Sequence, residues 1–133
     1  MNRHSALILH AHVPWVRHAE TPRCLEEDWL FEAILETYVP LLDVLHRLRD
    51  EGIHFRLTLN MTPTLLGMLS DELMKDRASA YIDRTARLAA SEVARSTDAG
   101  YKQMAQWYVD RMTLLKELYE NRWQRDLIQG FRD

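Results

Sequence analysis

The sequence predicts an α/β fold in which two parallel strands, joined by a long helix, precede a predominantly helical remainder. Three observations predict it: an apolar run over residues 5–12, a strictly alternating pattern over residues 53–60, and helical periodicity both between and after them. The order strand, helix, strand, helix is typical of a parallel pair with a right-handed crossover.

The first strand is predicted over residues 5–12, Ser-Ala-Leu-Ile-Leu-His-Ala-His. Its apolar residues are continuous rather than alternating, which is typical of a strand that is covered on both faces. Pro14 cannot donate to a sheet ladder, so the strand is expected to end near His12. Residues 13–25 contain prolines and mixed charges and predict an irregular loop.

A long amphipathic helix is predicted from about Glu26. Pro40 is expected to kink this helix or to restart it with Thr37 as the cap. Gly52 suits the left-handed position that ends a helix. The apolar face of the helix consists of residues three or four positions apart: Trp29, Leu30, Ile34, Tyr38, Leu41, Leu42, Leu45 and Leu48.

The second strand is predicted over residues 53–60, and helices follow it. Thr62-Pro63 predicts a helix cap followed by proline at the first helical position. A new helix is expected to begin near Leu69-Ser70-Asp71, residues 96–100 form a break, and Gly130 is expected to end the last long helix. That helix has an apolar face made of Tyr101, Met104, Tyr108, Met112, Leu115, Leu118 and Tyr119.

Composition excludes several classes of function. The chain has 133 residues, 47% of them apolar and 28% charged, with a net charge of −3, which suits one soluble domain. It has no Lys/Arg-dense stripe for nucleic acid and no apolar run of the roughly 20 residues that a membrane span needs. The apolar run near the start is too short for a signal peptide. The single cysteine, Cys24, cannot form an internal disulfide, so we expect a cytoplasmic protein.

Two parallel strands are too few for a stable sheet, because parallel sheets need several members and cover on both faces. A complete α/β barrel takes about 250 residues. The chain is therefore expected to be the opening of a larger domain.

The motif His10-Ala-His12 lies at the predicted end of the first strand. In α/β sheets and barrels, ligands bind at the carboxyl ends of strands. Residues two apart in an extended segment project to the same side, so the pair can hold a metal or form hydrogen bonds to a polar substrate. A purely structural role is equally open on the motif alone. Trp15, in the adjoining loop, can stack on a sugar ring, whereas Trp107 and Trp123 are expected in the core.

A catalytic zinc site needs at least three protein ligands. His46 falls within a helix and His54 near a strand start, so neither is expected to converge on the pair. His4 and His18 are the other two of the six histidines. Amidohydrolase barrels also begin with an HxH, and their other ligands come from later strands, so a fragment of such an enzyme is an alternative.

Acidic residues are concentrated at the start of the long helix, and glycosidases use paired carboxylates for catalysis. We expect these acids instead to form a solvated helix face and to compensate the helix dipole. They are Glu26, Glu27, Asp28, Glu32 and Glu36.

Four segments together resemble the N-terminus of glycoside hydrolase family 57, in order and spacing. They are LHAHVPWVRH (9–18), LEEDWLFEAI (25–34), ETYVPLL (36–42) and FRLTLNMTPTL (55–65). The likeness is strongest to the α-1,4-glucan branching enzymes of that family, and it weakens over residues 78–133. The resemblance implies a (β/α)7 TIM-like barrel, of which residues 1–76 supply the strand-helix-strand-helix opening and residues 77–133 a helical segment.

The resemblance also implies an activity: a retaining, two-step reaction on α-glucan that uses no metal or cofactor. His10 matches the family histidine beside the cleaved bond, His12 lies next to it, and Trp15 stands where tyrosine is usual. Asn60 and Thr62 stand where the family has small hydroxyl residues, near the end of its second strand. The glutamate nucleophile and the aspartate acid/base belong to later strands and have no counterpart in residues 1–133.

We therefore expect an incomplete catalytic domain, inactive by itself and open to self-association. A non-catalytic helical interaction module is the main alternative.

Overall fold

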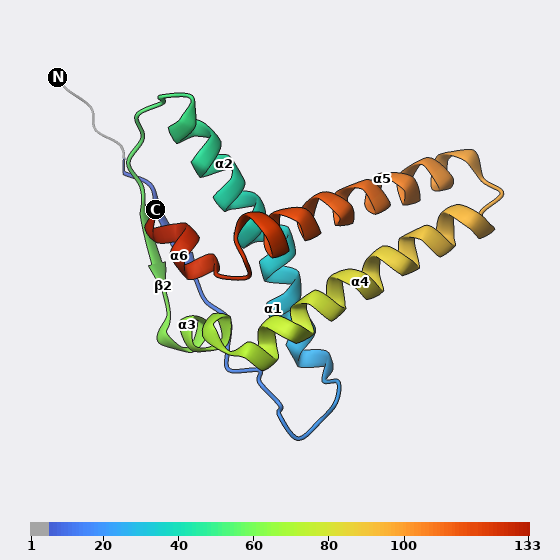
Figure 1. Ribbon diagram of the computed structural model, residues 1–133, viewed down its shortest axis with the longest axis horizontal. Coiled ribbons are helices and arrows are strands. Elements are labelled where there is room, and N and C mark those ends of the chain that lie inside the picture. Colours follow the sequence, from blue (N-terminus) through green and yellow to red (C-terminus); the bar gives the residue numbers. More distant parts are fainter. Residues whose placement is uncertain (1–5) are drawn as a thin grey trace.

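The computed structural model describes residues 6–133 and is largely helical, with one small sheet (Figure 1). Strands β1 (Ile8–Ala11) and β2 (Thr58–Met61) pair in parallel, with Ile8 opposite Thr58 and Ala11 opposite Met61. The predicted parallel pair is confirmed. Both strands are shorter than predicted, at four residues each.

The apolar patterns of the two strands overstate their burial. Ile8 is 63% exposed, so β1 is not covered on both faces as expected. Ile53 and Phe55 lie before β2, which begins only at Thr58, and they are 47% and 41% exposed, so the predicted start of the second strand at residue 53 is wrong. An apolar pattern indicates which face of a strand can be buried. That face is buried only where another segment packs against it.

The long helix is continuous but contains one wider turn. Helix α1 (Leu25–Ala33) runs through a π-helical turn, η1 (Ile34–Tyr38), into α2 (Val39–Asp50). Pro40 lies in the first turn of α2, and the π-helical turn before it accommodates the missing N–H and the bulk of the ring. Thr37 lies inside η1 and makes no cap, which corrects the prediction of a restart at that residue.

Glycine ends α2 as predicted. Gly52 has a φ of +73°. Its N–H donates to the Arg49 carbonyl and the next N–H, that of Ile53, donates to the Leu48 carbonyl, both at 2.9 Å. This is the Schellman arrangement, which satisfies the last carbonyls of a helix.

Trp29 does not join the apolar face of the helix. The buried residues of α1 are Glu27, Leu30 and Phe31, and this spacing turns Trp29 to solvent with 55% exposure. The core-facing stripe therefore includes a charged residue that the periodicity did not indicate.

Five more helical segments complete the chain: α3 (Pro63–Ser70), α4 (Glu72–Arg95), α5 (Ala99–Lys116), the π-helical η2 (Glu117–Arg122) and α6 (Leu127–Arg132). The predicted starts are confirmed by their caps. The side chains of Thr62, Asp71 and Asp98 accept hydrogen bonds from backbone N–H groups in the first turns of α3, α4 and α5.

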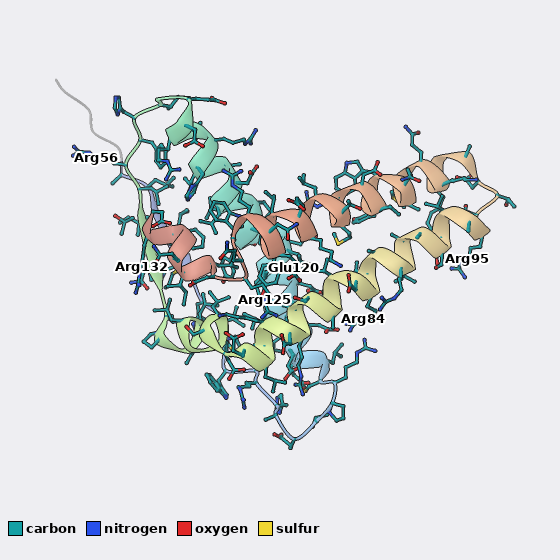
Figure 2. All side chains as sticks on the ribbon, in the orientation of Figure 1. Arg56, Arg84, Arg95, Glu120, Arg125 and Arg132 are labelled. Carbon is teal, nitrogen blue, oxygen red and sulfur yellow. The ribbon has the colours of Figure 1, made fainter. Side chains whose placement is uncertain are left out.

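Helices α4 and α5 form an antiparallel hairpin that projects away from the rest of the molecule (Figure 1). Charged side chains, among them Arg84 and Arg95, line it (Figure 2). Large side chains are buried only near the base of the hairpin, where Met112 is buried; further out Met104 is half exposed and the small Ala89 and Ala105 are buried between the helices. Trp107 is 54% exposed, so its predicted place in the core is wrong. It lies on the projecting part, where Arg111 covers its ring.

The C-terminal part turns back onto α2. The turn after η2 uses positive φ at Gln124 and Arg125, so Gly130 does not end the long helix as predicted. Gly130 instead lies buried inside α6, where a Cβ would come within 3.1 Å of Leu42 Cδ1. Trp123 packs partly buried against the core, as expected.

One apolar core joins α1 to α6. Its fully buried members include Leu30, Leu42, Leu65, Met68 and Ile82. A cavity of about 550 Å³ lies between α2, the segment before β2 and α6, away from the carboxyl ends of the strands. Among the described residues, no helix combines the length and apolar character needed to cross a membrane.

Candidate functional site

Four polar residues meet where the two strands end. His10 lies opposite Asn60 in the sheet register, and His12 follows directly after β1. Thr62 follows β2 and its N–H donates to the Ala11 carbonyl at 3.2 Å, which keeps the two chain segments together beyond the last pair. His10, His12 and Asn60 are exposed. The strand-end placement of the histidine pair is as the sequence predicts.

The loop that leaves β1 is fixed along α3. The Thr64 hydroxyl donates to the Val13 carbonyl at 3.4 Å, and the Val16 N–H contacts the Met68 sulfur at 3.4 Å. Val13 and Val16 themselves are buried. These contacts give the exposed residues of the loop a rigid base.

Trp15 lies between these two anchors with 56% of its surface exposed. A Cβ at Gly67 of α3 would lie 3.4 Å from Cζ3 of the indole, so one part of the ring rests on the helix. The remainder of the ring is free to stack on a ligand. Trp15 and the histidine pair come from the same short segment, at the same end of the sheet.

An ion pair fixes the loop further along. Nε of Arg17 donates to Oδ2 of Asp71 at 2.7 Å. Burial alone would raise the pKa of Asp71, but the N–H of Met74 and the guanidinium of Arg17 outweigh it and hold this pKa below its ordinary value. The carboxylate therefore serves two purposes, as the cap of α4 and as the partner of the loop.

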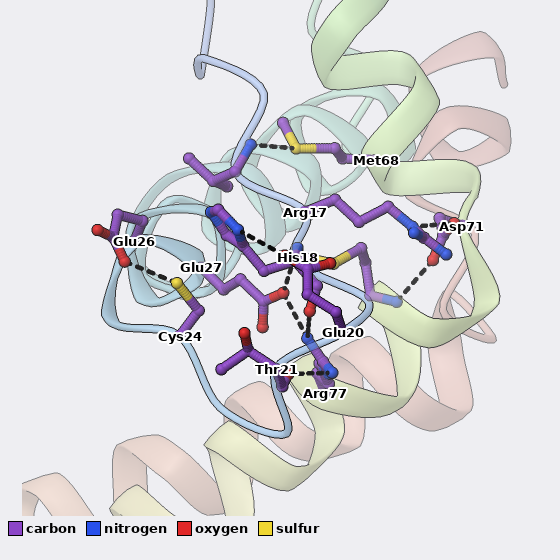
Figure 3. Close-up of polar contacts among 12 residues, drawn as sticks. Arg17, His18, Glu20, Thr21, Cys24, Glu26, Glu27, Met68, Asp71 and Arg77 are labelled. Atoms are coloured by element: carbon purple, nitrogen blue, oxygen red, sulfur yellow. Dashed lines mark hydrogen bonds and ion pairs between the residues drawn. The ribbon is translucent and has the colours of Figure 1, made fainter.

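A buried ion pair ties the loop to α1 and α4 (Figure 3). The Glu27 carboxylate is buried, pairs with the Arg77 guanidinium and accepts the His18 N–H at 3.0 Å. Arg77 also donates to the carbonyls of His18 at 3.0 Å and Thr21 at 2.7 Å. The expectation that Glu27 belongs to a solvated face is wrong. Its partner lies 50 residues away, and no local spacing in the sequence indicates the pair.

The other acids of this helix fit the predicted structural role. Glu26, Glu32 and Glu36 are exposed, and Glu36 accepts from Arg111 at 3.1 Å. Asp28 pairs with Arg84 at 3.2 Å. Glu26 accepts from the Cys24 thiol at 2.7 Å and Glu32 from the Tyr81 hydroxyl at 3.4 Å, so each of these acids has a contact within the protein.

The remaining histidines do not join the HxH pair. His46 is buried and its Nε2 lies 2.8 Å from the Gly130 carbonyl, a structural role. His54 is exposed at the cavity near α6. His4 lies outside the described residues. In the part of the chain that is described, His10 and His12 belong to no group of three metal-binding side chains.

The arrangement is suited to recognition of a hydroxyl-rich molecule. Two imidazoles, an amide and a hydroxyl offer hydrogen bonds, and an indole beside them offers an apolar face. These residues carry no carboxylate, so the groups that a glycosidase uses as nucleophile and acid are not among them.

Comparison with protein families gives a match over residues 6–133 to the model described as glycosyl hydrolase family 57. Among curated proteins, the chain is 45% identical over 85 residues to a 1,4-alpha-glucan branching enzyme of Thermococcus kodakarensis. It is 42% identical over 66 residues to a probable 1,4-alpha-glucan branching enzyme of Mycobacterium tuberculosis. These matches cover 63% and 49% of the chain and 12% of each relative's length.

Solved structures can be superposed on nearly the whole chain. A branching enzyme of the same family from Pyrococcus horikoshii matches with a TM-score of 0.86 and 30% identity. The alpha-amylase AmyC of Thermotoga maritima matches with a TM-score of 0.84 and 34% identity. Both alignments cover 96% of this chain and 24% of the other.

Proposed function

The chain belongs to glycosyl hydrolase family 57, and from that premise we propose that it forms the N-terminal portion of an α-1,4-glucan branching enzyme. Its two parallel strands and their helices correspond to the opening of the TIM-like barrel of that family. The chain spans 12% of the length of the curated branching enzymes it matches. The activity is therefore proposed for a longer enzyme that contains this portion.

The observation that carries the proposal is the segment His10 to Trp15 at the carboxyl end of β1. This is the end of a barrel at which substrates bind. The imidazoles of His10 and His12 donate and accept hydrogen bonds with sugar hydroxyls, and the exposed Trp15 ring stacks on the C–H face of a glucose unit. We propose these three as glucan-binding residues.

The binding part of the proposal is tested with the 133-residue chain by affinity electrophoresis in gels that contain amylose. Trp15→Ala and His10→Ala are expected to weaken retardation about tenfold, the equivalent of about 1.4 kcal/mol. Trp107→Ala is the matched control, because that indole is 54% exposed, against 56% for Trp15, and lies on the α4–α5 hairpin. Equal retardation of all three variants would rule out Trp15 and His10 as the glucan contacts.

The chemical part concerns the carboxylates. A retaining mechanism needs a nucleophile and an acid about 5 Å apart on either side of the bond. We propose that both come from segments outside residues 1–133, so the 133-residue chain alone leaves amylose unchanged. Activity of the chain that is lost on Glu26→Gln or Glu32→Gln would overturn this assignment.

Hydrolysis is a second candidate for the longer enzyme, because AmyC of Thermotoga maritima is described as an alpha-amylase. Branching lowers the iodine absorbance of amylose without new reducing ends, whereas hydrolysis produces reducing ends. Measurement of both quantities on an enzyme that contains the carboxylates separates the two reactions.

The alternatives raised by the sequence are not favoured. The family match extends over the helical segment as well as the strands, which favours one catalytic-domain portion over a separate interaction module. An amidohydrolase would belong to a different family. We further propose a cytoplasmic role in glycogen or related α-glucan synthesis, with no nucleic-acid partner.

A further inference from the structure

Three metal-binding side chains lie together at the far end of the β1–α1 loop. The ligand atoms of His18, Cys24 and Glu26 all lie within 4.8 Å of one another. Sγ of Cys24 is 2.7 Å from Oε2 of Glu26, and Nδ1 of His18 is 3.4 Å from Oε1 of Glu20 (Figure 3). His18 and Cys24 are half-buried and Glu26 is exposed, so solvent reaches the cluster.

Contacts within the protein position these groups. The buried Glu27–Arg77 pair clamps the His18 end of the loop through the His18 N–H and carbonyl. The other end is the beginning of α1, where Cys24 is the cap residue and Glu26 lies in the first turn. Glu27 itself belongs to that turn, so both ends of the loop are fixed to the same buried charge. A site whose ligands are already positioned loses less entropy when it binds an ion.

We propose that His18, Cys24 and Glu26 bind a zinc ion, with a water molecule as the fourth ligand. One sulfur, one nitrogen and oxygen donors in a small group match the ligand types and the coordination number of zinc. Magnesium and calcium prefer oxygen ligands alone, so the thiol argues against them. None of the proposed glucan-binding residues belongs to this cluster.

Binding exchanges a proton for the metal. The Cys24 thiol donates to Glu26, which raises the pKa of Cys24 and lowers that of Glu26. Zinc would bind the thiolate and release this proton.

The test uses the 133-residue chain with zinc alone and with cobalt alone. Equilibrium dialysis is expected to give one zinc per chain, and cobalt is expected to give a thiolate charge-transfer band in the near ultraviolet. Cys24→Ser should abolish the band, and Cys24→Ser and His18→Ala should each weaken zinc binding at least tenfold. His54→Ala and His10→Ala are matched controls that should bind zinc as the unchanged chain does, because both histidines are exposed and lie outside the cluster.

Three results would overturn the proposal: no zinc retained, no cobalt–thiolate band, or equal retention by Cys24→Ser. Loss of zinc on His10→Ala would also overturn it and would assign the ion to the HxH pair. Circular dichroism melts identify any variant that fails to fold, and the cobalt spectrum of the unchanged chain decides the question without a variant.

Discussion

At the scale of single residues, the Glu27 carboxylate joins segments that are far apart in the sequence. It pairs with Arg77 where the two side chains are only 2% and 15% exposed. Removal of one partner leaves the other charge buried and uncompensated, so Arg77→Ala is expected to lower the free energy of unfolding by about 3–5 kcal/mol. Urea denaturation at pH 7 measures the loss.

The matched control is Arg84→Ala. Arg84 pairs with Asp28 on the same two helices, but its side chain is 38% exposed and solvent screens the interaction. We expect a loss of less than about 1 kcal/mol there. Equal losses for the two variants would mean that burial does not distinguish the two ion pairs.

Asp71 gives a pH-dependent contribution with a defined sign. Burial raises its pKa, but the Met74 N–H and Arg17 lower it more, so the folded pKa lies below the unfolded value of about 3.9. Its charge therefore stabilises the fold above about pH 4, and this contribution is lost as the pH falls through the folded pKa. Asp71→Asn keeps a capping side chain and removes the charge, at an expected cost of about 1 kcal/mol at pH 7.

Denaturation of both proteins at a series of pH values checks this prediction. The difference between the unchanged chain and Asp71→Asn should shrink towards zero below about pH 4. A difference that stays constant from pH 7 to pH 3 would show that the ionised carboxylate contributes nothing.

At the scale of helices and strands, the features set by local chemistry could be predicted from sequence. Thr62, Asp71 and Gly52 end or begin helices because their own side chains or backbone freedom satisfy the adjacent groups. The predictions for Gly130 and Trp107 are wrong because the places of these residues depend on tertiary packing: α6 needs a close approach to α2, and the α4–α5 hairpin projects away from the core.

Gly52 offers a test of such a local feature. It has positive φ and open space around its Cα, so Gly52→Ala changes the backbone energy without a steric clash. We expect a loss of about 1 kcal/mol in unfolding free energy. Gly100→Ala, in the first turn of α5 with ordinary φ, should instead be neutral or stabilising by up to about 1 kcal/mol. Thermal melts of the two variants compare them, and a loss in both would point to some other cause than backbone strain.

At the scale of the whole molecule, the sequence predicts where the site lies but not what holds it. The HxH pair falls at a strand end because strand length and Pro14 are local properties. The Glu27–Arg77 pair and the gathering of His18 with Cys24 arise only when α4 packs against α1. The spacing of His18, Cys24 and Glu26 is the available signal for that cluster, and it is too common to indicate a site by itself.

The open side of the sheet has consequences for association. The Leu7 and Ala11 carbonyls accept from the N–H groups of Thr58 and Thr62, so the odd-numbered residues of this segment direct their backbone groups to β2. Because the direction alternates along a strand, Ile8 and His10 direct theirs to the opposite edge. The exposed Ile8 side chain adds an apolar surface to that edge, which is the usual setting for pairing between chains.

We therefore expect the 133-residue chain to self-associate through β1. Ile8→Lys should weaken this association about tenfold, because a lysine on an edge strand must lose its hydration when the strand pairs with another chain. The melting temperature should be unchanged, since Ile8 is 63% exposed. Leu88→Lys is the control, because Leu88 is 60% exposed on α4 and far along the chain from the sheet. Sedimentation velocity over a range of concentrations measures the association. If Leu88→Lys disperses the oligomer and Ile8→Lys does not, the hairpin is the contact surface. A cooperative melt from a monomer at every concentration would mean that residues 1–133 are a self-sufficient domain.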